Sequence, residues 1–266
     1  MAKFDAVLKK SLADQDEEAL EAQPFDTPIS DPVLPEEEAT QISTNGAYDT
    51  GISAGATGRA APLTREQLKL RSAVLQAQEA RGLRSVVVTG ISEESGVTSV
   101  ATALARGMSW DQNKNVLLID MNFSRPKLDR VFGLPHDEGM VSRLAHGGNL
   151  LDAAVAVEPS NLMVLPMGYG GRSAGFDAKK FVAAIPSFHD NFDFVVVDAP
   201  PISRYPDVLM VGAYFDSVAL VVEAERTRLP ELQVMVDELA RSRVKLLGVV
   251  LNRERNDLPN WLQSLL

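Results

Sequence analysis

Residues 84–105 read RSVVVTGISEESGVTSVATALA, which predicts a short strand, a polar turn and the start of a helix. Val86–Val88 form the β-branched run typical of a strand buried on both faces. After the turn, apolar residues recur at helical spacing: Val97, Val100, Ala101, Leu104 and Ala105. This order of elements is the layout of a phosphate-binding loop, in which backbone N–H groups and a helix N-terminus hold an anion.

The turn departs from the full phosphate-loop pattern, which is Gly, four residues, then Gly-Lys-Ser/Thr. Gly96 and Thr98 fit, but Ile91 takes the first glycine position and Val97 stands where the lysine is expected. The glutamates at 93 and 94 would oppose a phosphate by about 1 kcal/mol or more each at close range. The residues alone fit an ordinary strand-to-helix turn as well as they fit a phosphate loop that has lost its lysine.

Composition favours one sizeable domain of a cytoplasmic protein. The chain has 266 residues, of which 45% are hydrophobic, and it has no cysteine, which suits a reducing compartment. The first ten residues lack the apolar centre of a signal peptide. No run approaches the roughly 18 apolar residues of a membrane span, so we expect any membrane contact to be peripheral and through a partner.

The negative charge is concentrated near the N-terminus. Residues 1–60 hold 12 of the 36 acidic side chains and four basic ones, so −8 of the net charge of −10 lies there and −2 in the rest. The absence of a basic patch argues against nucleic acid as a partner. We expect residues 1–62 to be a disordered acidic segment and residues 63–266 to form an α/β domain.

A short apolar face near the start of the chain is formed by Phe4, Val7, Leu8 and Leu12. It fits a helix that docks on a partner, and equally a frayed amphipathic end.

Strand-like and helical patterns alternate along the domain. We expect strands at 85–89, 116–120, 162–165, 194–198, 217–222 and 246–251, and helices at 64–80, 97–111, 139–156, 176–189, 207–213 and 229–243. This alternation predicts a mostly parallel, doubly wound sheet covered by helices on both faces. In such sheets ligands lie at the carboxyl ends of the strands.

Two apolar strands end on an aspartate, at Asp120 and at Asp198. A carboxylate at a strand end can hold Mg²⁺ or its water. A single aspartate in this place is more simply a turn or helix cap, but two beside a phosphate-loop-like turn favour a metal and phosphate site.

Residues 116–133 resemble a motif of the bacterial tyrosine kinases of polysaccharide export (CpsD/CapB type), the cytosolic ATPase partners of Wzz-type chain-length co-polymerases. The matching residues are Asp120, Arg125, Pro126, Phe132 and Gly133, while Asn122 stands where the family has a second aspartate. Similar blocks lie at 161–168, 192–202, 220–227 and 247–252, so the resemblance covers about residues 64–252. It implies a P-loop NTPase-like fold related to MinD and ParA.

The resemblance also implies a site for ATP or ADP with Mg²⁺, and it places Asn252 beside the adenine. The cofactor-binding residues would be Gly96, Val97, Thr98, Ser99, Asn122, Arg125 and Asn252. The Mg²⁺ ligands would be Thr98, Asp120 and Asp198, with the two aspartates catalytic if the protein is active.

Departures from the family pattern point to weakened or lost phosphotransfer. The loop lysine is replaced by Val97, and the tyrosines, Tyr48, Tyr169, Tyr205 and Tyr214, include none in the last 50 residues, where the family carries its phosphorylated cluster. We therefore expect a regulator of exopolysaccharide or capsule export that binds an inner-membrane Wzz-type co-polymerase, with a homo-oligomer possible.

Two alternatives remain open. The first is an active tyrosine autokinase that controls polysaccharide chain length, in which Arg125 or a neighbouring subunit's arginine replaces the lysine. The second is a positioning ATPase of the MinD/ParA type.

Overall fold

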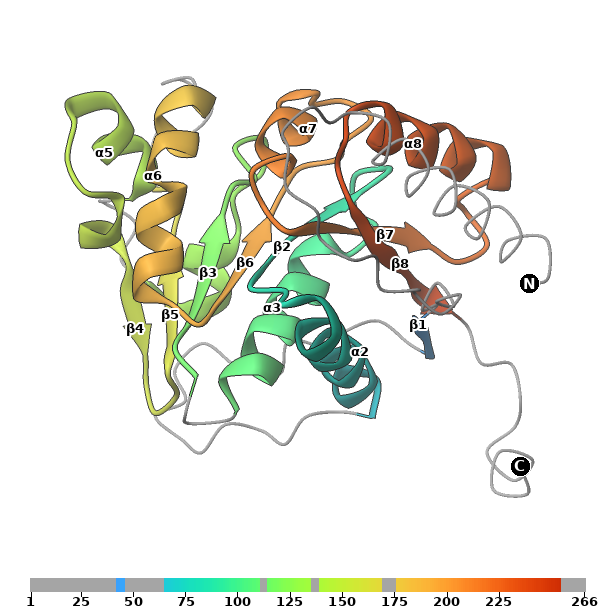
Figure 1. The fold of residues 1–266 in the computed structure, drawn as a ribbon, viewed down its shortest axis with the longest axis horizontal. Coiled ribbons are helices and arrows are strands. Elements are labelled where there is room, and N and C mark those ends of the chain that lie inside the picture. The colour runs from blue at the N-terminus through green and yellow to red at the C-terminus, as the bar shows by residue number, and fades with distance from the viewer. Residues whose placement is uncertain (1–41, 46–64, 111–113, 135–138, 169–175, 255–266) are drawn as a thin grey trace, which may run out of the picture.

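An eight-stranded sheet runs through the computed structural model, which describes residues 42–45, 65–110, 114–134, 139–168 and 176–254 (Figure 1). The strand order is β1-β8-β7-β2-β6-β3-β5-β4. The strands are β1 Ile42–Asn45, β2 Ser85–Gly90, β3 Val116–Asp120, β4 Val155–Val157, β5 Leu162–Leu165, β6 Phe194–Asp198, β7 Ser217–Glu223 and β8 Leu246–Glu254. Neighbouring strands are parallel, except that β4 runs antiparallel to β5.

Helices cover both faces of this sheet (Figure 1). The core on one face joins strand residues to α2 (Arg65–Arg81), α3 (Val97–Ser109) and α4 (Leu128–Phe132). The core on the other face joins strand residues to α5 (Met140–His146), α6 (Ala178–Asn191), α7 (Asp207–Gly212) and α8 (Leu229–Arg241).

The valine run of β2 shows why the strand sequence is continuously apolar. Val86 and Val88 pack into the core on the α3 side, and Val87 packs into the core on the opposite side. All three are 0% exposed. Because both faces of the sheet are buried, alternating polar residues have no place in the central strands. This arrangement confirms the predicted doubly wound, mostly parallel α/β fold.

The six predicted strands are all present, and so are five of the six predicted helices. The helix expected at 139–156 is wrong, because α5 ends at His146 and is followed by a 3₁₀ turn at Leu150–Ala153 and by β4. Gly147 and Gly148 have φ angles of 77° and 140°, in the region that glycine favours, and they end the helix. The short elements α4 and β4 were not predicted.

Strand β1 lies within the N-terminal segment that was expected to be disordered. Its residues Ile42–Asn45 pair in parallel with β8, so the expectation is wrong for these four residues. Strand β8 would otherwise leave unpaired backbone groups at the sheet edge. The remaining part of residues 1–62, with its possible docking helix, lies outside the described residues.

Among the helices that the structure describes, none combines the length and the apolar sequence that a membrane span requires.

Candidate nucleotide and magnesium site

The predicted site lies where the adjacent strands β2, β6 and β3 end. Hydrogen bonds tie the three following loops together. Ile202 N donates to Gly90 O at 3.0 Å, Met121 N donates to Asp198 O at 2.9 Å, and the Thr89 hydroxyl donates to Pro200 O at 2.7 Å. The loops therefore form one connected surface at the carboxyl ends of the strands.

Gly96 begins α3 with a left-handed backbone. Its φ is 89°, and a Cβ atom there would collide with the side-chain nitrogen of Asn252. Asn252 is 1% exposed, and its Nδ2 donates to Ser95 O at 2.8 Å. The asparagine that the resemblance placed beside adenine thus also holds the loop in place, and only glycine fits beneath it.

Val97, at the lysine position, belongs to the core on the α3 side and is 8% exposed. A Cβ atom built on Gly90 would meet Val97 Cγ2 at 2.9 Å, so the valine side chain packs closely on the end of β2. The loop therefore supplies no cation from this position. Thr98 and Ser99, one and two residues further on, are half-buried in the first turn of α3.

Asp198 is a fully buried carboxylate, and among the described residues neither of its oxygens has a hydrogen bond of good geometry. Burial raises its pKa well above the ordinary value, and repulsion from Asp120 raises it further. A weak hydrogen bond from the Thr98 side chain and the positive charge of Lys127 offset part of this rise. A buried, unpaired carboxylate is costly unless a cation or a proton satisfies it.

Asp120 lies beside Asp198 in register, but its carboxylate is already well satisfied. It accepts hydrogen bonds from the backbone N–H groups of Asn122, Lys127 and Leu128, each at 3.0 Å. Burial raises its pKa to about 6 even though these three donors lower it. Asp120 therefore shapes the turn that leads into α4, which is the cap role that a lone strand-end aspartate suggests.

Asn122 helps to form the same turn. Its side-chain oxygen accepts from the Ser124 hydroxyl at 2.8 Å and from Arg125 N at 3.1 Å. The structure gives this residue a turn-forming role, in addition to any contact with a ligand.

The residues predicted as Mg²⁺ ligands fit a magnesium ion. Mg²⁺ keeps several waters and commonly uses one or two carboxylates together with phosphate oxygens. Asp198 offers two oxygens without a good hydrogen bond, and Asp120 lies beside it on the neighbouring strand. The Thr98 side chain lies close enough to Asp198 to lower the pKa of its carboxyl. No group of three or more His, Cys, Asp or Glu converges among the described residues, so this pair of carboxylates would need further oxygen donors from the ligand and from water.

The guanidinium of Arg125 forms ion pairs with two glutamates of the loop after β2. Its Nη2 lies 2.9 Å from Glu93 Oε2 and its Nη1 lies 3.3 Å from Glu94 Oε1. Arg204 Nη1 also contacts Glu93, at 2.7 Å from Oε1. The sequence reading missed Arg204, although it follows the Pro-Pro turn at the end of β6, where ligand-binding residues are expected.

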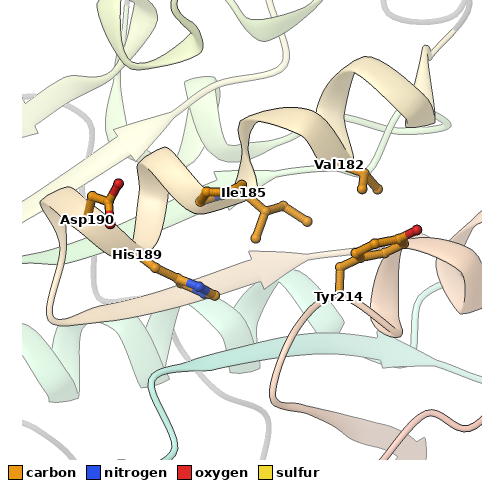
Figure 2. A pocket seen from close by; sticks show the side chains of 6 residues that line it. Val182, Ile185, His189, Asp190 and Tyr214 are labelled. Carbon is orange, nitrogen blue, oxygen red and sulfur yellow. The ribbon is translucent and has the colours of Figure 1, made fainter.

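A separate groove of about 480 Å³ lies between α6 and the residue Tyr214, which follows α7 (Figure 2). The side of the groove formed by α6 is lined by Val182, Ile185, Pro186, His189 and Asp190. None of the predicted site residues borders this groove, so it is distinct from the strand-end site.

The sheet and its strand-end site define the class of protein. The structure of the chimerical protein CapA2B2 superposes with a TM-score of 0.68 at 23% identity, covering 82% of this chain and 96% of that one. The septum site-determining protein MinD from Pyrococcus horikoshii, complexed with Mg-ADP, gives a TM-score of 0.56 at 21% identity and covers 68% of this chain and 76% of that one. The chain therefore has a P-loop NTPase-like fold.

The chain belongs to the family described as cellulose biosynthesis protein BcsQ, whose model matches residues 83–236. The tyrosine-protein kinase YwqD of Bacillus subtilis is 27% identical over 196 residues, which cover 73% of this chain and 82% of YwqD. The tyrosine-protein kinase wzc of Salmonella typhi is 26% identical over 185 residues, which cover 69% of this chain but only 25% of the wzc length. These relatives confirm the resemblance to bacterial tyrosine kinases.

Proposed function

We propose that this protein is a non-phosphorylating, cytoplasmic regulator of exopolysaccharide or capsule production, with a weak site for Mg-ADP or Mg-ATP. The observation that carries the proposal is the burial of Val97 in the core at the position of the missing lysine. A loop lysine neutralises charge that develops on the transferred phosphate, which contributes several kcal/mol to catalysis. A packed valine supplies none of this.

The magnesium side of the site supports retained binding. Asp198, Asp120 and Thr98 keep the arrangement of two buried carboxylates and a hydroxyl beside the first turn of α3. Asp198, Asp120 and Thr98 would hold Mg²⁺, and the bound ion would supply positive charge that offsets the negative charge of the phosphates. Gly96, Ser99 and Asn252 would place the phosphates and the base, and Asn122 and Arg125 would border the ligand.

The partner follows from the same relatives. Because this protein is similar to relatives that are named tyrosine-protein kinases, we propose that it docks on the cytosolic face of an inner-membrane Wzz-type co-polymerase, alone or as a homo-oligomer. This role does not need phosphate transfer.

The active-kinase alternative requires another cation at the phosphates. Arg125 was the candidate for this role, and in the structure its guanidinium is paired with Glu93 and Glu94. Arg125 therefore reaches a phosphate only when Glu93 and Glu94 are displaced, and this competition supports the non-phosphorylating proposal over the alternative.

Calorimetric titration of Mg-ADP and Mg-ATP into the purified protein tests the proposal, with Asp198→Ala as the control. We expect weak binding that the control abolishes, and no phosphotyrosine by mass spectrometry after incubation with Mg-ATP. Val97→Lys should tighten nucleotide binding. Phosphotyrosine on the wild-type protein would overturn the proposal, and nucleotide binding unchanged by Val97→Lys would show that the pocket has been misassigned.

A further inference from the structure

Four charged side chains meet at the mouth of the strand-end site, and we call them the Glu93 cluster: Glu93, Glu94, Arg125 and Arg204. They come from the three loops that follow β2, β3 and β6. Glu93 Oε2 lies 2.9 Å from Arg125 Nη2, and Glu93 Oε1 lies 2.7 Å from Arg204 Nη1. Glu94 adds a longer contact of 3.3 Å to Arg125.

Glu93 is the centre of this cluster, since each of its two oxygens contacts a different guanidinium. Its side chain is 23% exposed, whereas those of Arg125 and Arg204 are 45% and 64% exposed. Glu94, by contrast, is 66% exposed and reaches one arginine only. Two guanidinium groups that converge on one small anion form the arrangement by which arginine also recognises phosphate.

The loop backbone keeps these groups together independently of the charges. The Ser203 hydroxyl donates to Ile91 O, and Ile202 N donates to Gly90 O at 3.0 Å. Arg204 is therefore held beside the loop that carries Glu93 even if the ion pair opens. The two glutamates and two arginines sum to zero charge, so an incoming anion meets no net attraction while Glu93 is in place.

We propose that Arg125 and Arg204 form a binding site for a polyphosphate group and that Glu93 is a built-in competitor that occupies this site. This inference deepens, and rests on, the proposed function as a weak nucleotide-binding protein. Polyphosphate is the class of ligand that fits, because Glu93 and Glu94 lie on the loop that leads into α3, and Arg204 lies on the loop that begins after the buried Asp198. A buried carboxylate calls for a cation, which a phosphate chain can bring. The ligand must displace Glu93, so the affinity of the site depends on this exchange as well as on Val97.

The test is calorimetric titration of sodium pyrophosphate into the full chain and into the variants Glu93→Gln, Glu94→Gln and Glu93→Gln with Arg204→Gln. We expect Glu93→Gln to bind pyrophosphate about tenfold tighter than wild type, since a charge-assisted competitor is removed. Glu94→Gln, the matched control, should stay within about twofold to threefold. Adding Arg204→Gln should remove the gain. A folded Glu93→Gln variant without a gain, or a gain that survives Arg204→Gln, would overturn the proposal.

A parallel titration with Mg-ADP identifies the source of the polyphosphate. A similar gain with Mg-ADP assigns the site to nucleotides, and a gain with pyrophosphate alone assigns it to free polyphosphate. The two proposals also fail separately. The non-phosphorylating function fails on phosphotyrosine in the wild-type protein, whereas the Glu93 inference fails on the pyrophosphate titrations.

Discussion

Strands β3 and β6 both end on an aspartate at the same level of the sheet. The turns that follow the two strands differ in how many hydrogen bonds they donate to that carboxylate. Asp120 and Asp198 are register partners on adjacent strands, and both are fully buried. Three backbone N–H groups donate to Asp120, while neither oxygen of Asp198 has a hydrogen bond of good geometry among the described residues. Asp120 therefore stabilises the fold through its backbone hydrogen bonds, whereas the carboxylate of Asp198 is left available for a cation.

The difference between the two carboxylates arises from the turns that follow them. The chain after Asp120 turns through residues 121–127 into α4, and the N–H groups of Lys127 and Leu128 at the start of this helix donate to the carboxylate. The chain after Asp198 continues through Pro200 and Pro201, which lack N–H groups and cannot donate to it. The sequence of the following turn thus decides which carboxylate is satisfied by the backbone.

The largest effect should come from Asp120→Ala. This change leaves three N–H groups without an acceptor, two of them in buried hydrogen bonds, and we expect a loss on the order of 3 kcal/mol in the free energy of unfolding. Urea denaturation measures it. Asp198→Ala is the matched comparison, since it removes no backbone hydrogen bond and should cost far less. Equal losses in the two variants would show that the turns do not differ in this way.

A smaller effect should appear in the pH dependence of stability. The pKa of Asp120 is raised to about 6 and that of Asp198 is raised well above its ordinary value, so the folded protein binds more protons than the unfolded chain above about pH 4. Stability from this pair is therefore greatest at low pH and falls as pH rises through the folded pKa values. We expect a loss on the order of 1–2 kcal/mol between pH 5 and pH 8.

Asp198→Asn tests this origin, because it removes the repulsion between the two carboxylates while keeping the shape of the side chain. The variant should be more stable than wild type at pH 8 and nearly equal to it at pH 5, as judged by urea denaturation at each pH. If the stability difference between Asp198→Asn and wild type were the same at both pH values, the pH dependence would not arise from Asp198.

The smallest effect should be stabilisation by magnesium alone. With Asp198 unpaired and Asp120 beside it, Mg²⁺ at a concentration near its dissociation constant should raise the free energy of unfolding at pH 8 by less than about 1 kcal/mol. Thermal unfolding with and without MgCl₂ measures this shift. Asp198→Asn should abolish the shift, and a shift retained in that variant would place the ion elsewhere.

Most of the fold follows from local pattern. The valine run of β2 and the apolar runs that end at Asp120 and Asp198 could be read as buried strands, because burial on both faces demands continuous apolar sequence. The expected helix across 139–156 failed because two glycines at 147 and 148 adopt left-handed backbone that apolar periodicity does not reveal. Strand β1 was missed because a four-residue edge strand depends on the strand it joins.

By itself the sequence determined the alternation of strands and helices, the position of the loop at 90–96, the loss of its lysine at Val97 and the two strand-end aspartates. These features depend on neighbouring residues along the chain. Only the tertiary structure decided that Asp120 is satisfied and Asp198 is not, that Glu93 contacts Arg204 across 111 positions, and that Asn252 holds Ser95 across 157. Those contacts depend on which loops meet when the parallel sheet forms, because strand order and register set the distances between side chains that are far apart in sequence.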